Sequence, residues 1–488
     1  MTGPTVGAIG VAHHRALRTV GLCTTGLILA GAFRAPGLGS FLSFLLVLFA
    51  AVLPTLLWLR GGARGIPVLA VVAAVHIVTF ALPVVSDRPD LASYSDAERF
   101  RAAASVALFL LVACGVGEWL IARSQSRRVT LPRSLSARQM TSFMFLGLAL
   151  GLVYQVAFAE GLLWALGPAM GVVRAVSLTA LTVAAYFFGV ARAGGHLRGA
   201  TFGAALTVII AVILLNLSDL YLVGGATIAG AAFLGYVLTS RRIPWAALAL
   251  FFVLLSIFQN GKETMRRRYW DRPSGYAQAA SSTEVPGRIV EWMRAGLGRG
   301  ESEAEVSTVL GRASLLQMLL LAQHLTPAHI DFLRGESYAQ LPSMLVPRVL
   351  SERKVSSQAG MDLLNRRYGL VSFEGPAESA ITWGLIAEGW ANFGYLGIIG
   401  AAMFVGLFCS VLTRWSTGAA AVSRPTLFSI AAMLGLINAS DAASVVVSLW
   451  QTFVAVLVAF WAFRAFAGQR RSTASKAVGV TSRLPRRL

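Results

Sequence analysis

The feature that most constrains this chain is a series of apolar runs, each long enough to cross a membrane. A helical span takes roughly 17 to 25 residues, because the hydrocarbon layer is about 30 Å thick. We predict twelve spans, at residues 19–33, 38–59, 65–85, 102–122, 139–159, 175–191, 200–217, 220–240, 243–259, 394–413, 425–439 and 443–463. Of the 488 residues, 56% are apolar and only 13% are charged, against about 25% charged in soluble domains. The sequence therefore predicts an all-α polytopic membrane protein.

The orientation follows from the Lys and Arg residues in the short loops, which concentrate on the cytoplasmic side. With the N-terminus inside, the inner segments hold 22 Lys and Arg and the short outer loops hold five. We therefore expect both termini to be cytoplasmic. The net charge of +20 is then largely this topology signal, lying where anionic lipid attracts it. Nucleic acid is not an expected partner.

The spans are unevenly distributed, and they divide the chain into four parts. We predict a nine-helix membrane region at 1–259, a large outer loop at 260–393, a three-helix membrane region at 394–463 and a basic cytoplasmic tail at 464–488. The loop carries 15 Lys and Arg and 14 Asp and Glu. A loop of this length is seldom a mere connector, so we expect the chemistry there.

Two apolar stretches are too short to span. The run at 313–325 is expected to lie on or dip into the outer leaflet, with a core helix of a folded outer domain as the alternative. The stretch at 161–173 has a central Gly-Pro break and is a candidate re-entrant segment, which would need shielding by neighbouring helices.

Several familiar motifs are missing from the sequence. It has no G-x-x-x-x-G-K-[ST], HExxH or G-x-S-x-G, so it lacks the usual signatures of ATP hydrolysis, zinc proteolysis and ester hydrolysis. The cysteines Cys23, Cys114 and Cys409 fall in predicted spans without a CxxC partner, and we read them as buried apolar side chains. The six histidines form no ligand cluster. We expect neither a metal nor a cofactor.

Glu388 and Asn392 stand where the apolar run of a late span begins, in "GLIAEGWANFGYLGIIGAA". Four residues apart, they share one face of a helix. A carboxyl group at the edge of low-dielectric surroundings tends toward a raised pKa, which suits a general base. A structural hydrogen bond at the helix start is an equally good interpretation at this point.

Arginines populate the rest of the outer loop. Guanidinium groups match phosphate oxygens in a bidentate manner, so a phosphate at the outer leaflet would find partners here. For any single arginine, contact with lipid headgroups or with the acids of the loop is the simpler alternative.

One segment of the loop resembles a known family. In order, "GR" (311–312), "GESY" (335–338), "PRVLSERK" (347–354), "RRYGL" (366–370) and "AEGWANFGYLGIIGAAMFVGL" (387–407) resemble motifs of the Wzy-type O-antigen and oligosaccharide-repeat-unit polymerases of bacterial envelopes. The resemblance covers about a fifth of the chain. It departs from the family where a lysine usually stands in Trp-Pro-x-Lys-Pro, since Lys354 lies in "LSERKVSS".

The resemblance implies a membrane-embedded, GT-C-like inverting glycosyltransferase in the bacterial inner membrane. It would move a growing glycan from an undecaprenyl diphosphate carrier to an incoming lipid-linked repeat unit, on the outer face. Membrane lipid, a chain-length regulator and other polysaccharide assembly proteins are the implied partners. The implied catalytic residues are Glu388, as base or acceptor-orienting group, with Arg348 and Arg312 at the diphosphate. The implied substrate contacts are Arg366, Arg367, Tyr368, Lys354, Asn392, Glu336, Tyr338 and Arg267.

Three other functions remain open at this point. An O-antigen ligase would carry an outer-loop histidine in a recognisable setting, which the sequence around His324 and His329 does not show. A flippase or transporter of lipid-linked sugars would place charged residues inside several spans, and the predicted spans are nearly free of charge. A scaffold protein of envelope assembly would tolerate conservative changes in the loop.

Overall fold

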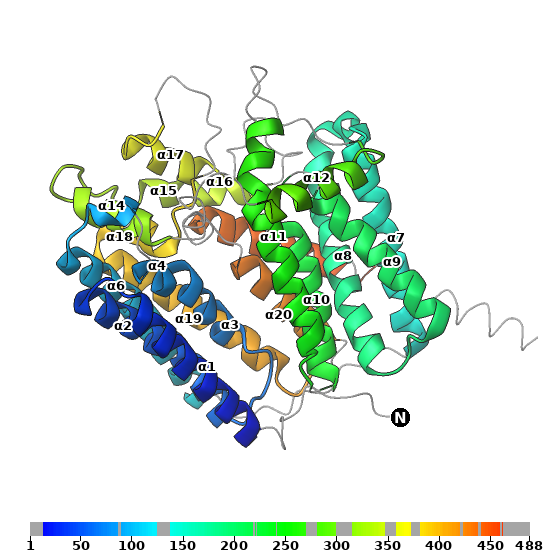
Figure 1. The fold of residues 1–488 in the computed structure, drawn as a ribbon, viewed down its shortest axis with the longest axis horizontal. Coiled ribbons are helices and arrows are strands. Elements are labelled where there is room, and N and C mark those ends of the chain that lie inside the picture. Colours follow the sequence, from blue (N-terminus) through cyan, green and yellow to red (C-terminus); the bar gives the residue numbers. More distant parts are fainter. Residues whose placement is uncertain are drawn as a thin grey trace, which may run out of the picture.

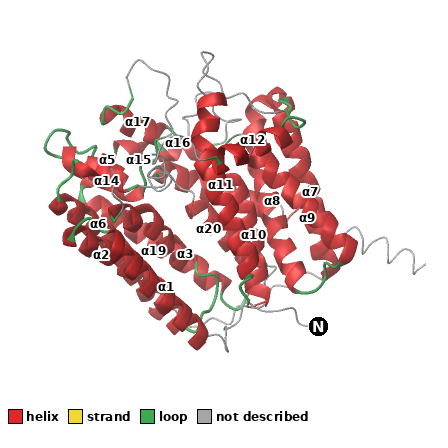
Figure 2. Cartoon of the chain, viewed as in Figure 1, coloured by secondary structure: helices red, strands yellow, loops and turns green. Residues whose placement is uncertain are grey.

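In the part that the structure describes, the regular secondary structure is entirely helical, with loops and turns between the helices (Figure 2). The structure is a computed structural model. It describes residues 13–85, 89–123, 137–217, 220, 222–240, 242–269, 281–298, 315–346, 358–371, 381–419, 423–437, 441–458 and 461. No strand occurs in these ranges, and the prediction of an all-α protein is confirmed.

Eight helices are long and apolar enough to cross a membrane. They are α2 (Leu38–Arg60), α6 (Asp96–Arg123), α7 (Ala137–Ala159), α8 (Met170–Ala193), α9 (Gly199–Leu217), α10 (Leu222–Ser240), α11 (Trp245–Tyr269) and α19 (Tyr395–Ser416). The polytopic α-helical class is thereby confirmed. In a membrane this is the expected outcome, because a helix satisfies its own backbone hydrogen bonds where water is absent.

The other four predicted spans are also helical but shorter or less apolar. They are α1 (His13–Arg34), the run α3 (Val68–His76), η1 (Ile77–Ala81) and α4 (Leu82–Val84), then α20 (Arg424–Ile437) and the helix Ala442–Val458. The central η1 is a π-helical turn. A total of twelve spans therefore remains a prediction.

Two groups of helices can be followed in Figure 1. On one side α1, α2, α3, α6 and α19 lie together, and on the other side α7, α8, α9 and α10 pack against one another. Small residues allow close packing in the second group, where a Cβ on Gly235 would stand 2.2 Å from the carbonyl oxygen of Tyr186. Only glycine permits α8 and α10 to touch backbone to backbone at that level.

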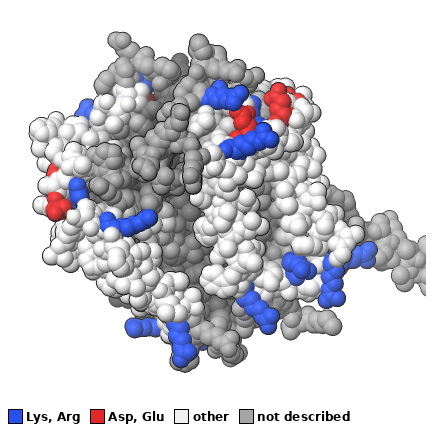
Figure 3. Space-filling view, viewed as in Figure 1, with Lys and Arg blue, Asp and Glu red and all other residues white. Residues whose placement is uncertain are grey.

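The two ends of the helix bundle differ in charge. At one end the backbone N–H of Ile66 donates to Ser416 Oγ (2.8 Å), which ties the segment after α2 to the end of α19. Both helices finish there with arginine, Arg60 and Arg414. In Figure 3 the lower part of the visible face shows basic side chains only, while acidic and basic ones lie together higher up.

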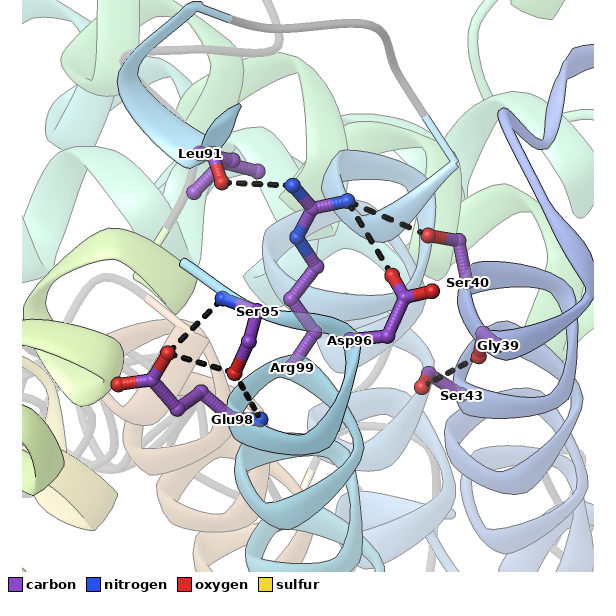
Figure 4. A network of polar contacts seen from close by, with 8 residues as sticks. All are labelled: Gly39, Ser40, Ser43, Leu91, Ser95, Asp96, Glu98 and Arg99. Carbon is purple, nitrogen blue, oxygen red and sulfur yellow. Dashed lines mark hydrogen bonds and ion pairs between the residues drawn. The ribbon is translucent and has the colours of Figure 1, made fainter. Parts of the chain in front are cut away.

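The opposite end of α6 is held by a polar network (Figure 4). Arg99 donates to the carbonyl oxygen of Leu91 (2.8 Å) and approaches Asp96 (3.8 Å). The nitrogen that approaches Asp96, Nη1, also reaches Ser40 Oγ at 3.4 Å, so the network joins α6 to the start of α2. Glu98 accepts hydrogen bonds from Ser95, which fixes the first turn of α6.

The described part of the outer loop forms short helices at this end. They are α12 (Val285–Leu297), α14 (Leu316–Leu325), α15 (Glu336–Ala339), α16 (Leu341–Leu345), α17 (Ala359–Arg367) and α18 (Leu385–Phe393). In Figure 1 α15, α16 and α17 lie at the upper end of the helix bundle, with α14 and α18 to their left and α12 apart from them beside α11. The core that buries α14, α17 and α18 is continuous with that of the membrane helices, so this part of the loop packs on the helix bundle and has no core of its own.

Two details differ from the sequence interpretation. Helix α14 packs between α6 and α18, with Leu316 and Leu319 fully buried and Gln323 Nε2 donating to Ser105 Oγ (2.8 Å). It is a core helix, as in the alternative interpretation, and its apolar face is covered by α6 and α18 and not open to lipid. The segment η2 (Leu162–Ala169) is an exposed turn that joins the antiparallel α7 and α8, with Trp164 70% exposed, so the shielding that a re-entrant segment needs is not present around it.

Candidate functional site

The short helix α18 carries the two polar residues singled out in the sequence. Glu388 and Asn392 are only 1% and 0% exposed, and Asn392 Nδ2 donates to the carbonyl oxygen of Glu388 (2.8 Å). Their spacing of four residues puts both side chains on the buried face of the helix. Buried polar groups of this kind are costly unless they are hydrogen-bonded, so their partners decide what the pair does.

Both oxygens of the Glu388 carboxyl group have partners from other segments. Oε1 accepts a hydrogen bond from Ser337 Oγ in α15 (2.7 Å), and Oε2 accepts one from the backbone N–H of Ala442 (2.6 Å). Ser337 Oγ also accepts a bond from Asn392 Nδ2 (2.9 Å). The carboxyl group therefore joins three segments that lie far apart in the sequence.

The turn before α15 is fastened to the end of α18. The N–H of Leu333 donates to the carbonyl oxygen of Ala391 (3.0 Å), and the N–H of Arg334 donates to that of Asn392 (3.1 Å). The N–H of Gly335 donates to Asn392 Oδ1 (3.0 Å). Asn392 thus uses both ends of its amide to hold the turn that carries Ser337.

A second buried carboxyl group, that of Asp441, lies at the start of the helix Ala442–Val458. Asp441 is 1% exposed, its Oδ1 accepts from the N–H of Ser444 (2.8 Å), and its own N–H donates to Ser444 Oγ (2.9 Å). This reciprocal pair is a helix cap. Since Glu388 accepts the next N–H of the same helix, two carboxyl groups share one helix N-terminus, where the helix dipole favours negative charge.

The pKa of Glu388 is raised by this environment to about 7. Burial is the largest cause, and the neighbouring Asp441 carboxyl raises the pKa further, while the bonds from Ala442 and Ser337 act in the opposite direction. A carboxyl group with a pKa near neutrality can both accept and release a proton at physiological pH. The arrangement is therefore competent for acid–base chemistry.

The segment "RRYGL" is anchored to the same region by aromatic residues. The hydroxyls of Tyr368 and Thr326 share a hydrogen bond (2.6 Å), and Trp390 Nε1 of α18 donates to the carbonyl oxygen of Thr326 (3.2 Å). Tyr368 also packs on Trp383, with ring centroids 4.6 Å apart. Tyr368 is only 6% exposed, so its observed role is to fix α17 on α18.

The other predicted site residues are placed as follows. Arg366 Nε donates to Asp362 Oδ2 (3.0 Å), and Arg367 and Glu336 are exposed. Tyr338 is half-buried beside Asn392 and Glu388, and burial, followed by the Glu388 charge, raises its pKa. Arg267 belongs to the last turn of α11, which continues well past the predicted span end at 259.

Arg312, Arg348 and Lys354, which the resemblance also implies as site residues, lie outside the described residues.

Sequence reasoning missed Ser337 and Asp441. "SDAAS" before an apolar run is a helix-start signal, but nothing local indicates that this cap meets Glu388. Gly360 of α17 packs against both of these residues: a Cβ at this position would stand 3.4 Å from Asp441 Oδ2 and 3.7 Å from the carbonyl oxygen of Ser337. Within the ranges that the structure describes, no three His, Cys, Asp or Glu side chains are grouped closely enough to hold a metal ion.

Three kinds of comparison were made for the whole chain. Neither protein-family models nor curated proteins nor solved structures gave a match. The site is consequently defined by its own geometry: a buried carboxyl group of raised pKa, held by Ser337, Asn392 and a helix N-terminus at one end of a membrane helix bundle.

Proposed function

We propose that the protein is a glycosyltransferase that polymerises undecaprenyl-diphosphate-linked oligosaccharide repeat units at the outer face of the bacterial inner membrane. One observation carries the proposal. The segments "GESY", "RRYGL" and "AEGWANFG", on which the resemblance to Wzy-type polymerases rests, are separated in sequence but are joined through α18: Ser337 of the first bonds the Glu388 carboxyl group, and Tyr368 of the second is linked through Thr326 to Trp390. Both termini would then be cytoplasmic, with the short helices of the loop outside.

The reaction needs a base and a stabilised leaving group. A hydroxyl oxygen of the acceptor sugar attacks the anomeric carbon of the donor glycan, the bond from that carbon to the carrier diphosphate breaks, and the hydroxyl proton passes to the base. Glu388 suits the base because its pKa of about 7 matches the working pH. Its burial means that the proton passes through the Ser337 hydroxyl or follows displacement of the turn at 335–339.

Arginines supply the electrostatic part of the proposal. Arg334 and Arg367 are exposed at the end of the helix bundle that carries the site, and Arg366 precedes Arg367 in α17. Positive groups fixed near a diphosphate stabilise the charge that develops as it leaves. The predicted Arg312 and Arg348 would act in the same way. The activated bond of the donor supplies the driving force, so no nucleotide is needed.

The test uses purified protein in nanodiscs, lipid-linked repeat units and no nucleotide, with products resolved by length on a gel. A ladder from the wild type that is lost in Glu388→Gln, and kept in the matched control Glu284→Gln, supports the proposal. Glu284 is a suitable control because it is an exposed carboxylate of the same outer loop, on the turn before α12. A normal ladder from Glu388→Gln would overturn the assignment of the base.

One contact favours a second candidate, transfer of a finished glycan to another acceptor lipid. His324 Nδ1 hydrogen-bonds Glu98 Oε1 (2.7 Å), and the ring is half exposed. A carboxylate that orients an imidazole in this way prepares it for acid–base chemistry. A single added polymer chain instead of a ladder, lost in His324→Asn, would identify this ligase-type activity. Movement of substrate across a sealed bilayer without any transfer would identify a transporter.

A further inference from the structure

Three aromatic side chains lie where the turn before α15 meets the end of α18, and we call Phe332, Tyr338 and Phe393 the aromatic shelf. The rings of Tyr338 and Phe393 are stacked, with centroids 6.4 Å apart and an interplanar angle of 29°. Phe393 is 44% exposed although it ends a helix whose other face is buried. The shelf is therefore open on one side and attached to the buried carboxyl site on the other.

The backbone below the shelf is held in an unusual conformation. Arg334 has a φ of +49°, a value that side chains with a Cβ rarely adopt and that costs free energy. Gly335 follows with a φ of +94°, and a Cβ on it would stand 3.1 Å from the Phe393 ring. Gly394 lies in the same way under Phe332, at 3.3 Å. The hydrogen bonds from this turn to α18 keep the rings in place.

Charged side chains of both signs stand on the turn that carries two rings of the shelf. Asp331, Arg334 and Glu336 are all exposed and stand within six residues of one another on the turn that bears Phe332 and Tyr338. A lipid-facing surface of this protein has a different composition. On α11 the exposed Leu250, Phe252 and Val253 have no charged neighbour in the same helical turn. Aromatic faces edged by charged hydrogen-bonding groups suit a ligand that is apolar on one face and rich in hydroxyls at its rim.

We propose that the aromatic shelf binds a pyranose ring of the acceptor glycan, with the C–H face of the sugar on Phe393 and Tyr338 and its hydroxyls toward Arg334 and Glu336. The assignment of this sugar as the acceptor rests on the proposed function. Tyr338 links the two parts of the site, since its side chain also interacts with Asn392 and lies near the Glu388 charge. A sugar on the shelf is thereby placed next to the proposed base.

The test is a binding measurement on the full-length chain in nanodiscs. The probes are the methyl glycosides of glucose, galactose, rhamnose and N-acetylglucosamine, and the readout is saturation transfer from protein to sugar protons by NMR. At least one probe should receive saturation at its ring C–H protons. Phe393→Leu should weaken that binding about tenfold, because it removes the stacking face. The matched control Phe252→Leu alters an exposed ring on α11 and should bind like the wild type.

Further variants and probes distinguish sugar binding on the shelf from contact of the same rings with lipid acyl chains. Tyr338→Phe retains the ring and should keep most of the binding, because stacking does not need the hydroxyl. If no probe binds, or if Phe393→Leu binds as well as the wild type, the proposal is overturned. It is also overturned if spin-labelled lipid acyl chains broaden the fluorine signal of 4-fluorophenylalanine placed at position 393.

The same variants distinguish this proposal from the proposed function. With lipid-linked substrates, Phe393→Leu should raise the KM for the acceptor about tenfold and leave kcat nearly unchanged. If the glycosides bind but the wild type makes no ladder, the polymerase proposal fails and the sugar site stands. If the ladder forms and Phe393→Leu leaves the KM unchanged, the shelf proposal fails and the polymerase stands.

Discussion

Replacing Glu388 by glutamine should change the stability of the protein in opposite directions at low and at high pH. The folded protein raises the pKa of this carboxyl group from its ordinary 4.5 to about 7. Between these two pH values the folded state holds the proton while the unfolded state has lost it. The contribution to stability is therefore fully present below 4.5, falls as the pH rises toward 7 and stays at its minimum above that.

The difference between the two pKa values sets the size of the change in the free energy of unfolding. At about 1.4 kcal/mol for each pH unit, ionised Glu388 costs the folded wild type about 3 kcal/mol at alkaline pH. Glutamine does not ionise and avoids this cost, but it rearranges the bonds to Ser337 and Ala442 at a cost of about 1 kcal/mol at every pH. Glu388→Gln should thus be about 2 kcal/mol more stable than the wild type near pH 8.5 and about 1 kcal/mol less stable near pH 4.5.

The assay is thermal unfolding of the two proteins in nanodiscs from about pH 4.5 to about pH 9. A fixed scan rate is required, because large membrane proteins commonly unfold irreversibly. Glu284→Gln removes an exposed carboxylate (side chain 62% exposed) and should parallel the wild type throughout. A difference in melting temperature between Glu388→Gln and the wild type that has the same sign and size at every pH would refute a raised pKa.

Three further changes test the surroundings of the site and the packing of the helices. Asp441→Asn removes a charge that helps to raise the pKa of Glu388. In this background Glu388→Gln should therefore gain less stability at alkaline pH, as a double-mutant cycle of melting temperatures would show. Gly397→Ala would put a methyl group 1.9 Å from a carbonyl oxygen of α18 and should cost about 1 to 3 kcal/mol or more, whereas Gly400→Ala, with nothing within 4 Å, should melt like the wild type. Trp292→Phe deletes a buried hydrogen bond of 2.6 Å to α11 and should cost about 1 to 3 kcal/mol, while the exposed Trp164→Phe should be neutral; equal melting temperatures for both would show that α12 is not held by this bond.

The positions of the membrane helices could be predicted because length and hydropathy alone require them. A long apolar run has only one way to satisfy its backbone in lipid, and eight of the predicted spans are helices of sufficient length. The pairing of Glu388 with Asn392 was predictable for a similar reason, since a spacing of four residues fixes two side chains on one helix face. Both predictions depend on residues that are neighbours in the sequence.

The partners of Glu388 could not be predicted, because they are distant in the sequence. Ser337 and Ala442 lie 51 and 54 residues away, and only the packing of α15 and of the helix Ala442–Val458 against α18 brings them to the carboxyl group. Helix α14 illustrates another limit. Leucines such as Leu316 and Leu319 are equally compatible with lipid and with a protein core, so their pattern does not reveal which of the two surrounds them.

The corner between α18 and α19 connects the buried carboxyl group mechanically to a helix that crosses the lipid bilayer. Gly394 turns the chain with a φ of +60°, and Gly389 and Gly397 press the two helix backbones together across the corner. Because the backbones of α18 and α19 are in close contact at this corner, we expect a tilt of α19 to shift Glu388 and the segments bonded to it. Helices tilt when their apolar length exceeds the thickness of the bilayer. Acyl-chain length thereby becomes a variable that sets the depth of this carboxyl group in the membrane, with no ligand or modification involved.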